Sequence, residues 1–183
     1  MIGLTFRNIH SSTFKIGAKS IDRSLIPTLR QNEFTIPGRH GTIDFGANKY
    51  DKRPIKVNIG LVKNVSFEEL RKSARDIAYW LSGKGLLIFD DEPDKAYYAS
   101  VYSYVGIDQI ELKPLGTISV TFECQPFAES LDYLQVNKTV TTNPDNIPLM
   151  INGTADTGCI ITIKNTGTTN ISSISITRKA VIE

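Results

Sequence analysis

The amino-acid sequence predicts a mainly β protein: an antiparallel β-sandwich with one amphipathic helix and a protruding β-hairpin arm, followed by a short or partial second β domain. Three observations predict this fold. Apolar and polar residues alternate with a period of two in several segments, one segment has helical periodicity, and turn residues interrupt a polar region near the N-terminus. The chain has 183 residues, enough for one large domain or for one ordinary domain and a partial second.

The segment 24–50 is predicted to form the hairpin arm. Two modestly polar extended runs, Thr28–Ile36 and Thr42–Phe45, meet at Pro37–Gly41. The proline fixes its own φ and the glycines permit positive φ, so the chain is expected to fold back on itself there. Because its apolar residues are few, this hairpin has little to bury against its own domain. One interpretation is that the arm reaches for a partner.

The clearest strands follow the arm. Ile55–Leu61 and Ile118–Cys124 both alternate between apolar and polar residues, which predicts strands with one dry and one wet face and favours an antiparallel sheet. Leu86–Phe89 is a short apolar run, and Ala96–Val105 is rich in tyrosine and valine. Both compositions suit a pleated surface, so two further strands are expected.

A helix is predicted between the first two of these strands, over about 66–82. Its apolar residues recur at spacings of three and four; they are Phe67, Leu70, Ala74, Ile77, Ala78 and Leu81. Ser66 and Glu69 have the spacing of a capping box, and Gly83 with Gly85 supplies a stop. Since the charged residues fall mostly off the apolar stripe, the helix is expected to lie against a sheet.

The composition changes after Cys124, and a domain boundary is placed near Val136. The expected domains are 1–136 and a linker with a partial β domain at 137–183. Strand-like pieces at Ile160–Ile163 and Ile171–Ile176 are separated by a turn. The segment from Thr139 onward has about 45 residues, which is below the usual size of an independent domain.

Charge and cysteine content exclude several classes of protein. The formal net charge of +2 indicates neither nucleic acid nor anionic lipid as a partner. Cys124 and Cys159 form no CxxC pair, so both are interpreted as small core residues. No window is apolar enough to span a bilayer, and the first residues lack a signal-peptide pattern, so a cytoplasmic origin is expected.

The candidate catalytic and metal-binding residues favour a structural interpretation. The acids Asp90, Asp91, Glu92 and Asp94 lack the glycine and the final glutamate of a calcium loop, so they are interpreted as a hairpin turn. His10 and His40 are interpreted as exposed loop histidines, since no nucleophile motif accompanies them. We therefore predict that the protein is not an enzyme and has no cofactor, metal or catalytic residue.

Aromatic and basic residues leave two binding hypotheses open. One group of aromatic residues fits a sugar-binding or base-stacking face: Tyr97, Tyr98, Tyr102 and Tyr104. Tyrosine is also common on strands for structural reasons alone, and this structural interpretation is favoured. Arg30, Arg39 and Arg53 flank the arm, where surface arginines solvate it or pair with acids across an interface.

Four segments, in the same order, resemble the distal tail proteins (Dit) of siphophages and related prophages. They are the run from Pro37 to Gly46, the helix end at Trp80–Leu81, the run from Leu87 to Asp94, and the run from Phe122 to Ala128. The resemblance implies an N-terminal β-sandwich with one helix and an arm that reaches over the neighbouring subunit. It also implies a C-terminal galectin-like sandwich, whose beginning is similar to the stretch from Asn152 to Thr168. About 45 residues hold too few strands for that sandwich, so a short or truncated version of it is expected.

The resemblance further implies a function. These domains close into a homo-hexameric ring at the virion tail tip, assembled in the bacterial host cytoplasm, which joins the tail tube protein to the tail-associated fibre, lysin or baseplate proteins. No membrane partner and no specific nucleic-acid binding are implied. The arm would then be a subunit interface, formed by Pro37, Gly38, Arg39, His40, Gly41, Thr42, Ile43, Asp44 and Phe45. The alternatives are a monomeric carbohydrate-binding β-sandwich module and an esterase or nuclease that uses His40.

Overall fold

The computed structural model describes residues 3–46, 49–61, 67–102, 117–151 and 153–179. The chain divides into two compact units, Met1–Asn143 and Pro144–Glu183. The first unit contains every helix and strand of the described residues.

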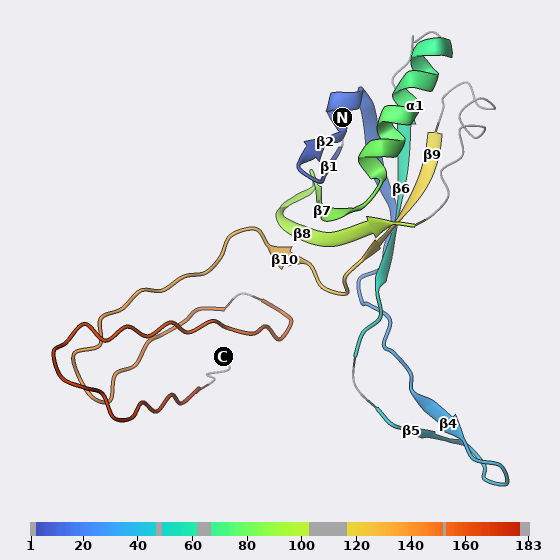
Figure 1. Cartoon of the computed structure of the whole chain (residues 1–183). Helices are drawn as coiled ribbons and strands as arrows, with labels where there is room; N and C mark the ends of the chain where they lie inside the picture. Colours follow the sequence, from blue (N-terminus) through green and yellow to red (C-terminus); the bar gives the residue numbers. More distant parts are fainter. Residues whose placement is uncertain (1–2, 47–48, 62–66, 103–116, 152, 180–183) are drawn as a thin grey trace. The chain divides into compact units, whose positions relative to one another are not determined.

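The main sheet of the first unit has eight strands in its described part, all paired antiparallel. Seven follow the order β2-β1-β7-β8-β9-β6-β3, and β10 pairs with the first half of β8 (Figure 1). Their bounds are β1 Leu4–Phe6, β2 Ile9–His10, β3 Ile16–Arg23, β6 Arg53–Leu61, β7 Lys84–Phe89, β8 Glu92–Val101, β9 Thr117–Cys124 and β10 Glu129–Ser130.

The period-two strands predicted from the sequence are confirmed. β6 and β9 pair with Val57 opposite Val120 and Ile55 opposite Phe122, and all four side chains are fully buried. Burying one such side chain contributes about 1.5–3 kcal/mol, so these alternating residues contribute strongly to stability. The two strands expected at Leu86–Phe89 and Ala96–Val105 are β7 and β8; the last residues of the second expectation lie outside the described residues.

The sheet curls strongly, which gives it the sandwich-like core that the sequence predicts. β1 and β9 are three strands apart, a separation of about 14 Å in a flat sheet. The rings of Phe6 on β1 and Phe122 on β9 nevertheless meet edge to face, with centroids 5.2 Å apart. The inner faces of distant strands therefore enclose one hydrophobic core. At the open edge of the sheet, β3 carries an irregularity in its pairing between Ser20 and Asp22.

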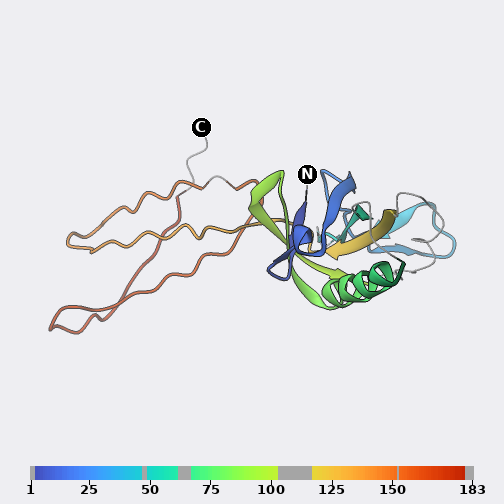
Figure 2. The same cartoon turned by 90° about the horizontal axis from the view of Figure 1, so that it is seen from above.

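Helix α1 (Phe67–Leu81) lies along one side of the curled sheet (Figure 2). Trp80 is buried, packs against Phe6 and Phe14, and donates a 2.9 Å hydrogen bond from Nε1 to the carbonyl oxygen of Phe6. The residues that α1 buries are Ala74, Ile77, Trp80 and Leu81.

The expected stripe of α1 is wrong at one position. Ala78 is exposed, because at about 100° per residue it lies a quarter turn from the centre of the buried stripe. Ser66 and the side chains of Phe67, Glu69 and Leu70 lie outside the described residues. The predicted stop is confirmed: Gly83 has a φ of +97°, and the N–H of Ser82 donates to the carbonyl of Ala78 at 3.0 Å.

The predicted arm is a separate two-stranded hairpin that extends from the main sheet (Figure 1). Strands β4 (Glu33–Thr35) and β5 (Thr42–Asp44) pair antiparallel across the turn Pro37–Gly41. The outer part of the expected run Thr28–Ile36 forms strand, and its inner part is joined to the returning chain by one isolated bridge, Leu29 to Tyr50.

The second unit differs from the expected partial β domain. Its described residues are assigned to no strand, so the strands expected at Ile160–Ile163 and Ile171–Ile176 are wrong for this chain. Their isoleucines are exposed, Ile160 to 96%. A strand gains its stability from ladder hydrogen bonds and from packing on a neighbour, and a strand-like composition alone supplies neither. Cys159 lies here and is exposed, so the expectation that both cysteines are core residues holds only for Cys124.

Candidate functional site

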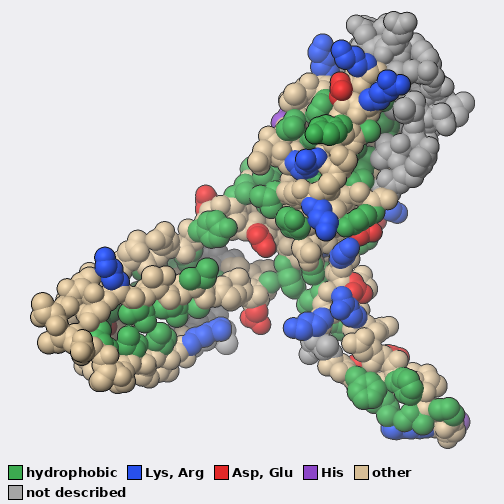
Figure 3. Space-filling view, viewed as in Figure 1, with side chains coloured by type: hydrophobic (Ala, Val, Ile, Leu, Met, Phe, Trp, Pro, Cys, Tyr) green, Lys and Arg blue, Asp and Glu red, His purple; other side chains and the backbone are tan. Residues whose placement is uncertain are grey.

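The arm has one apolar face that is not covered within the first unit. Phe34 stands directly opposite Ile43 in the ladder, and Ile36 and Phe45 follow two residues along each strand on the same side. Phe34 is 61% exposed and Phe45 69%. Figure 3 shows hydrophobic side chains gathered on this hairpin. We call these four residues the apolar arm face. A hairpin of two short strands is unstable alone, so this face is suited to packing on another surface.

The opposite face of the arm is polar and acidic. Glu33 and Asp44 stand opposite each other in the ladder, where like charges repel. Glu33 accepts a 2.8 Å hydrogen bond from the hydroxyl of Thr42, and Asp44 accepts one of 2.8 Å from the N–H of Gly46. Neither carboxylate has a basic partner among the described residues. The arm acid pair, as we call Glu33 and Asp44, therefore carries uncompensated negative charge.

The turn at the tip of the arm needs its glycines. Gly38 and Gly41 have φ values of +83° and +80°, in the left-handed region that side chains with a Cβ rarely adopt. The N–H of Arg39 donates to the carbonyl of Ile36 at 3.2 Å. The side chains of Arg39 and His40 are exposed at this tip, as the sequence predicts for His40.

The root of the arm is tied to the main sheet. Arg30 pairs with Asp51, with Nε 2.8 Å from Oδ1, and the rings of Tyr50 and Phe127 meet edge to face at 5.2 Å. Arg53 is not the surface arginine expected from the sequence: only 9% of it is exposed. It lies over the ring of Tyr97 and donates from Nη2 to the carbonyl of Leu25 at 3.2 Å, because it enters the inner side of β6 at the end of the core.

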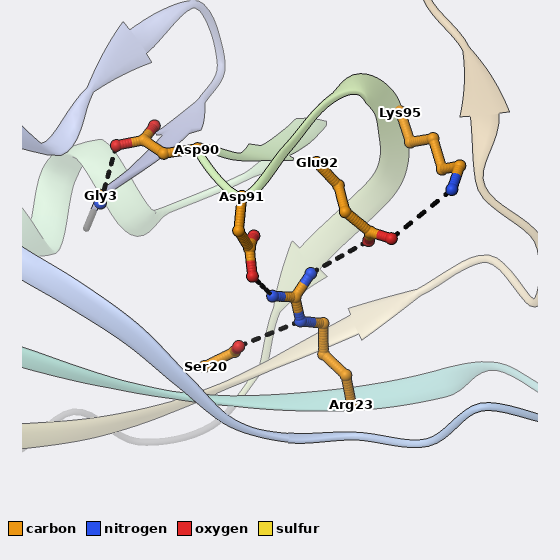
Figure 4. A network of polar contacts seen from close by, with 7 residues as sticks. All are labelled: Gly3, Ser20, Arg23, Asp90, Asp91, Glu92 and Lys95. Atoms are coloured by element: carbon orange, nitrogen blue, oxygen red, sulfur yellow. Dashed lines mark hydrogen bonds and ion pairs between the residues drawn. The ribbon is translucent and has the colours of Figure 1, made fainter.

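The acidic cluster is the turn that the sequence predicts, and Arg23 and Lys95 pair with two of its four acids (Figure 4). Arg23 donates to Asp91 and, at 3.1 Å, to Glu92; its guanidinium lies 4.3 Å from the centre of the Phe89 ring. Asp90 accepts a 2.8 Å hydrogen bond from the N–H of Gly3. In the part of the chain that is described, no group of three or more acids, histidines or cysteines is placed to hold a metal ion.

His10 was expected to be an exposed loop histidine, but it belongs to β2, and 39% of its side chain is exposed. It is half-buried, its Nε2 lies 3.1 Å from Oδ1 of Asp90, and its Nδ1 accepts from the N–H of Ser12 at 3.2 Å. These contacts join β2 to the turn between β7 and β8. Because both ring nitrogens are engaged within the chain, His10 acts as a structural link.

A second surface lies on the outer face of β7 and β8, and it contains two of the four tyrosines that the sequence suggested as a binding face. Leu86 stands opposite Tyr98 in the ladder, and Tyr102 follows β8. Tyr98 is 46% exposed and Tyr102 60%. Beside them is a small cavity of about 50 Å³, lined by Lys52, Lys84, Tyr98, Ser100, Tyr102, Glu123, Cys124 and Gln125. We call Leu86, Tyr98, Tyr102 and this cavity the tyrosine recess.

The four tyrosines do not form the continuous face that was considered. Tyr97 is buried on the inner side of the sheet, because neighbouring residues of a strand point to opposite faces. Tyr104 lies outside the described residues. Leu86 is apolar although it lies on the solvent-facing side of β7. An apolar residue at such a position is the sequence signal that could have located the recess.

The charges around the recess are partly paired. Lys52 lies 3.1 Å from a carboxylate oxygen of Glu123 and 5.2 Å from the centre of the Tyr102 ring. Lys84 has no ion-pair partner among the described residues. A hydrogen bond with Ser100, followed by the charge of Lys84, lowers the pKa of Tyr102 from its ordinary value. Burial raises the pKa of the neighbouring Cys124 thiol to about 12.

The described chain contains no helix long and apolar enough to cross a membrane. No curated protein is similar enough in sequence to count as a relative. Among solved structures, the fold is similar to the Dit protein (gp 19.1) of phage SPP1, described as a paradigm of the hub adsorption apparatus in phages that infect Gram-positive bacteria. The TM-score is 0.55 at 15% sequence identity. The match covers 71% of this chain and 52% of the SPP1 protein, so this chain matches about half the length of that protein.

The sequence comparison places the chain in a family. Residues 10–124 match the family described as the phage tail protein RIFT-related domain. This match covers β3 to β9, the helix and the whole arm, together with the residues that form most of the core. The resemblance predicted from the sequence is thus confirmed, and the chain belongs to this family of siphophage tail proteins, with a fold like that of a distal tail protein.

Proposed function

We propose that this chain is a non-enzymatic structural component of a phage tail tip whose copies form a homo-hexameric ring. The ring joins the tail tube protein on one side to the tail-associated fibre, lysin or baseplate proteins on the other, and it is assembled in the host cytoplasm. The ring-forming part is the domain 1–136, and the interface is the arm segment from Pro37 to Phe45.

The observation that carries this proposal is the uncovered apolar arm face. Four apolar side chains stand on one side of a hairpin that lies apart from the core. Covering one such side chain with protein contributes about 1.5–3 kcal/mol, less the cost of association. An arm that meets a different surface on the next copy makes a heterologous contact, and repetition of that contact closes a ring when the rotation allows.

The alternative, a monomeric carbohydrate-binding module, has weaker support. Sugar rings stack on exposed aromatic faces, but Tyr97 is buried, and of the four candidate tyrosines the described residues place Tyr98 and Tyr102 on the outer face. The strands expected at 160–163 and 171–176 are also absent from the described residues of the second unit. A second sandwich for sugar binding therefore has no structural support within the described chain.

Light scattering of the purified chain over a range of concentrations tests the proposed function. We expect a mass of six chains, with rings visible by negative-stain microscopy. Replacing Phe34 and Phe45 by serine should shift the mass towards one chain while circular dichroism and the melting temperature stay close to those of the parent. The matched control is Tyr79→Ser, which removes an aromatic residue with 77% exposure from α1. A parent chain that stays monomeric at high concentration would refute the ring.

A further inference from the structure

The tyrosine recess has the features of a surface that is covered in an assembly. Leu86 and Tyr98 form a cross-strand pair on the outer face of a sheet whose inner face already packs on the core. Tyr102 and Tyr98 flank the small cavity. Exposed aromatic side chains beside a recess are the usual anchors of protein–protein interfaces, where tyrosine is enriched.

The charges of the recess and of the arm are complementary. Lys52 is paired with Glu123, which leaves Lys84 as the cation of the recess without an ion-pair partner among the described residues. The arm acid pair, Glu33 and Asp44, likewise has no basic partner among the described residues. Each surface therefore combines exposed apolar side chains with uncompensated charge, and the two charges have opposite sign.

The dimensions of a hairpin allow both contacts at once. When the apolar arm face packs on a surface, the acid pair lies on the far side of a ribbon of only two strands, which are about 5 Å apart. A long lysine side chain beside the ribbon can reach around its edge with its ammonium group while its methylene groups contact apolar atoms. Lys84 stands two residue pairs from Leu86 and Tyr98 in the β7–β8 ladder, on the same face and at the border of the apolar patch.

We propose that the tyrosine recess of one copy is the receptor for the apolar arm face of a second copy, with Lys84 beside the arm acid pair. This inference rests on the proposed ring and names the surface that receives the arm. The donor and receptor surfaces are different parts of the chain, so each copy can give one arm and receive another.

Cross-linking between chains that carry one introduced cysteine each tests this docking. All chains carry Cys159→Ser, because Cys159 is exposed, whereas Cys124 is buried. Chains with Ile36→Cys and chains with Tyr98→Cys, bearing different tags, are co-expressed and treated with a short bis-maleimide. We expect a cross-linked pair that contains both tags. The donor control is Thr35→Cys on the opposite face of the arm, and the receptor control is Tyr79→Cys on α1; each should give several-fold less product.

Charge reversal supplies a second readout. Lys84→Glu should weaken assembly by about two- to fivefold, the effect of an exposed ion pair. Adding Glu33→Lys to Lys84→Glu should restore assembly. The control is Lys56→Glu, which changes a lysine elsewhere on the sheet; adding Glu33→Lys to this variant should not strengthen its assembly.

The outcomes separate this inference from the proposed ring. A six-chain mass with no product between Ile36→Cys and Tyr98→Cys above the controls would overturn the docking and leave the ring intact. Product formed equally with Thr35→Cys would also overturn it. A parent chain that is monomeric at every concentration would overturn both. Selective cross-linking together with rescue of Lys84→Glu would establish the receptor.

Discussion

Individual residues in this protein join segments that are distant in sequence. Trp80 closes α1 onto β1 through its hydrogen bond to Phe6, and Arg23 ties β3 to the turn between β7 and β8. His10 reaches the same turn from β2. Trp80 and Arg23 combine their polar contacts with packing on the rings of Phe6 and Phe89. The curled shape of the sheet is therefore held by side chains as well as by strand pairing.

The two cysteines should differ sharply in reactivity. Cys124 is fully buried and its pKa is raised to about 12, while Cys159 is exposed. Since the thiolate is the nucleophile, a thiol-specific disulfide reagent at pH 8 should modify one thiol per native chain and two in denaturant. Mass spectrometry of the modified chain should assign the native reaction to Cys159. Rapid modification of both thiols in native protein would contradict the buried position of Cys124.

Arg23 should matter more than an ordinary surface cation. Its guanidinium contacts Asp91, Glu92 and the ring of Phe89. Arg23→Met removes these charge-assisted hydrogen bonds, leaves Asp91 without its cation and leaves Glu92 with only Lys95, so the free energy of unfolding in urea should fall by about 1–3 kcal/mol. Lys95→Met, which removes only an exposed partner of Glu92 at 3.5 Å, should cost less than about 1 kcal/mol. Equal losses in the two variants would contradict this role of Arg23.

At the scale of elements, local sequence patterns predict those strands, helices and turns whose formation depends mainly on neighbouring residues. β6 and β9 follow from alternation, α1 from its stripe and its glycine stop, and the arm from its turn. What the sequence does not contain is the distance between remote residues. The ion pair of Arg23 spans 68 positions, and the recess gathers residues from four segments of the chain. The buried position of Arg53 likewise depends on which side of β6 meets the core.

The glycines of the arm turn allow a test at the same scale. Replacing Gly38 and Gly41 by valine puts β-branched residues at φ values near +80°, which strains the turn. The open space around both glycines means that the penalty comes from the backbone and not from clashes. Because the arm lies apart from the core, assembly measured by light scattering should be lost while the melting temperature changes little. Equal loss of folding and assembly would contradict the arm as an assembly element.

At the scale of the whole molecule, stability is concentrated in the first unit. Every residue of the hydrophobic core cluster lies between Leu4 and Cys124. The second unit, Pro144–Glu183, exposes its isoleucines and is assigned to no strand in its described residues. The strand-like composition of its two expected strands was misleading because a strand needs a partner, and no local signal reports whether one is present.

Shortening the chain tests this distribution of stability. A chain that ends at Asn143 retains the whole core cluster, so its melting temperature should stay within a few degrees of the parent and its unfolding should remain cooperative. Circular dichroism at several wavelengths is the measurement. A large fall in the melting temperature, or loss of cooperativity, would show that residues 144–183 contribute to the fold of the first unit.

The irregular edge strand β3 has a consequence for how copies can meet. A regular edge strand offers unpaired N–H and C=O groups to any similar strand, and repeated edge pairing grows into fibres without end. In β3 the pairing shifts between Ser20 and Asp22, and charged Lys19, Asp22 and Arg23 stand around the shift. Such a bulge with flanking charges discourages pairing at that edge. An edge of this kind favours association through surfaces that can close over open-ended aggregation.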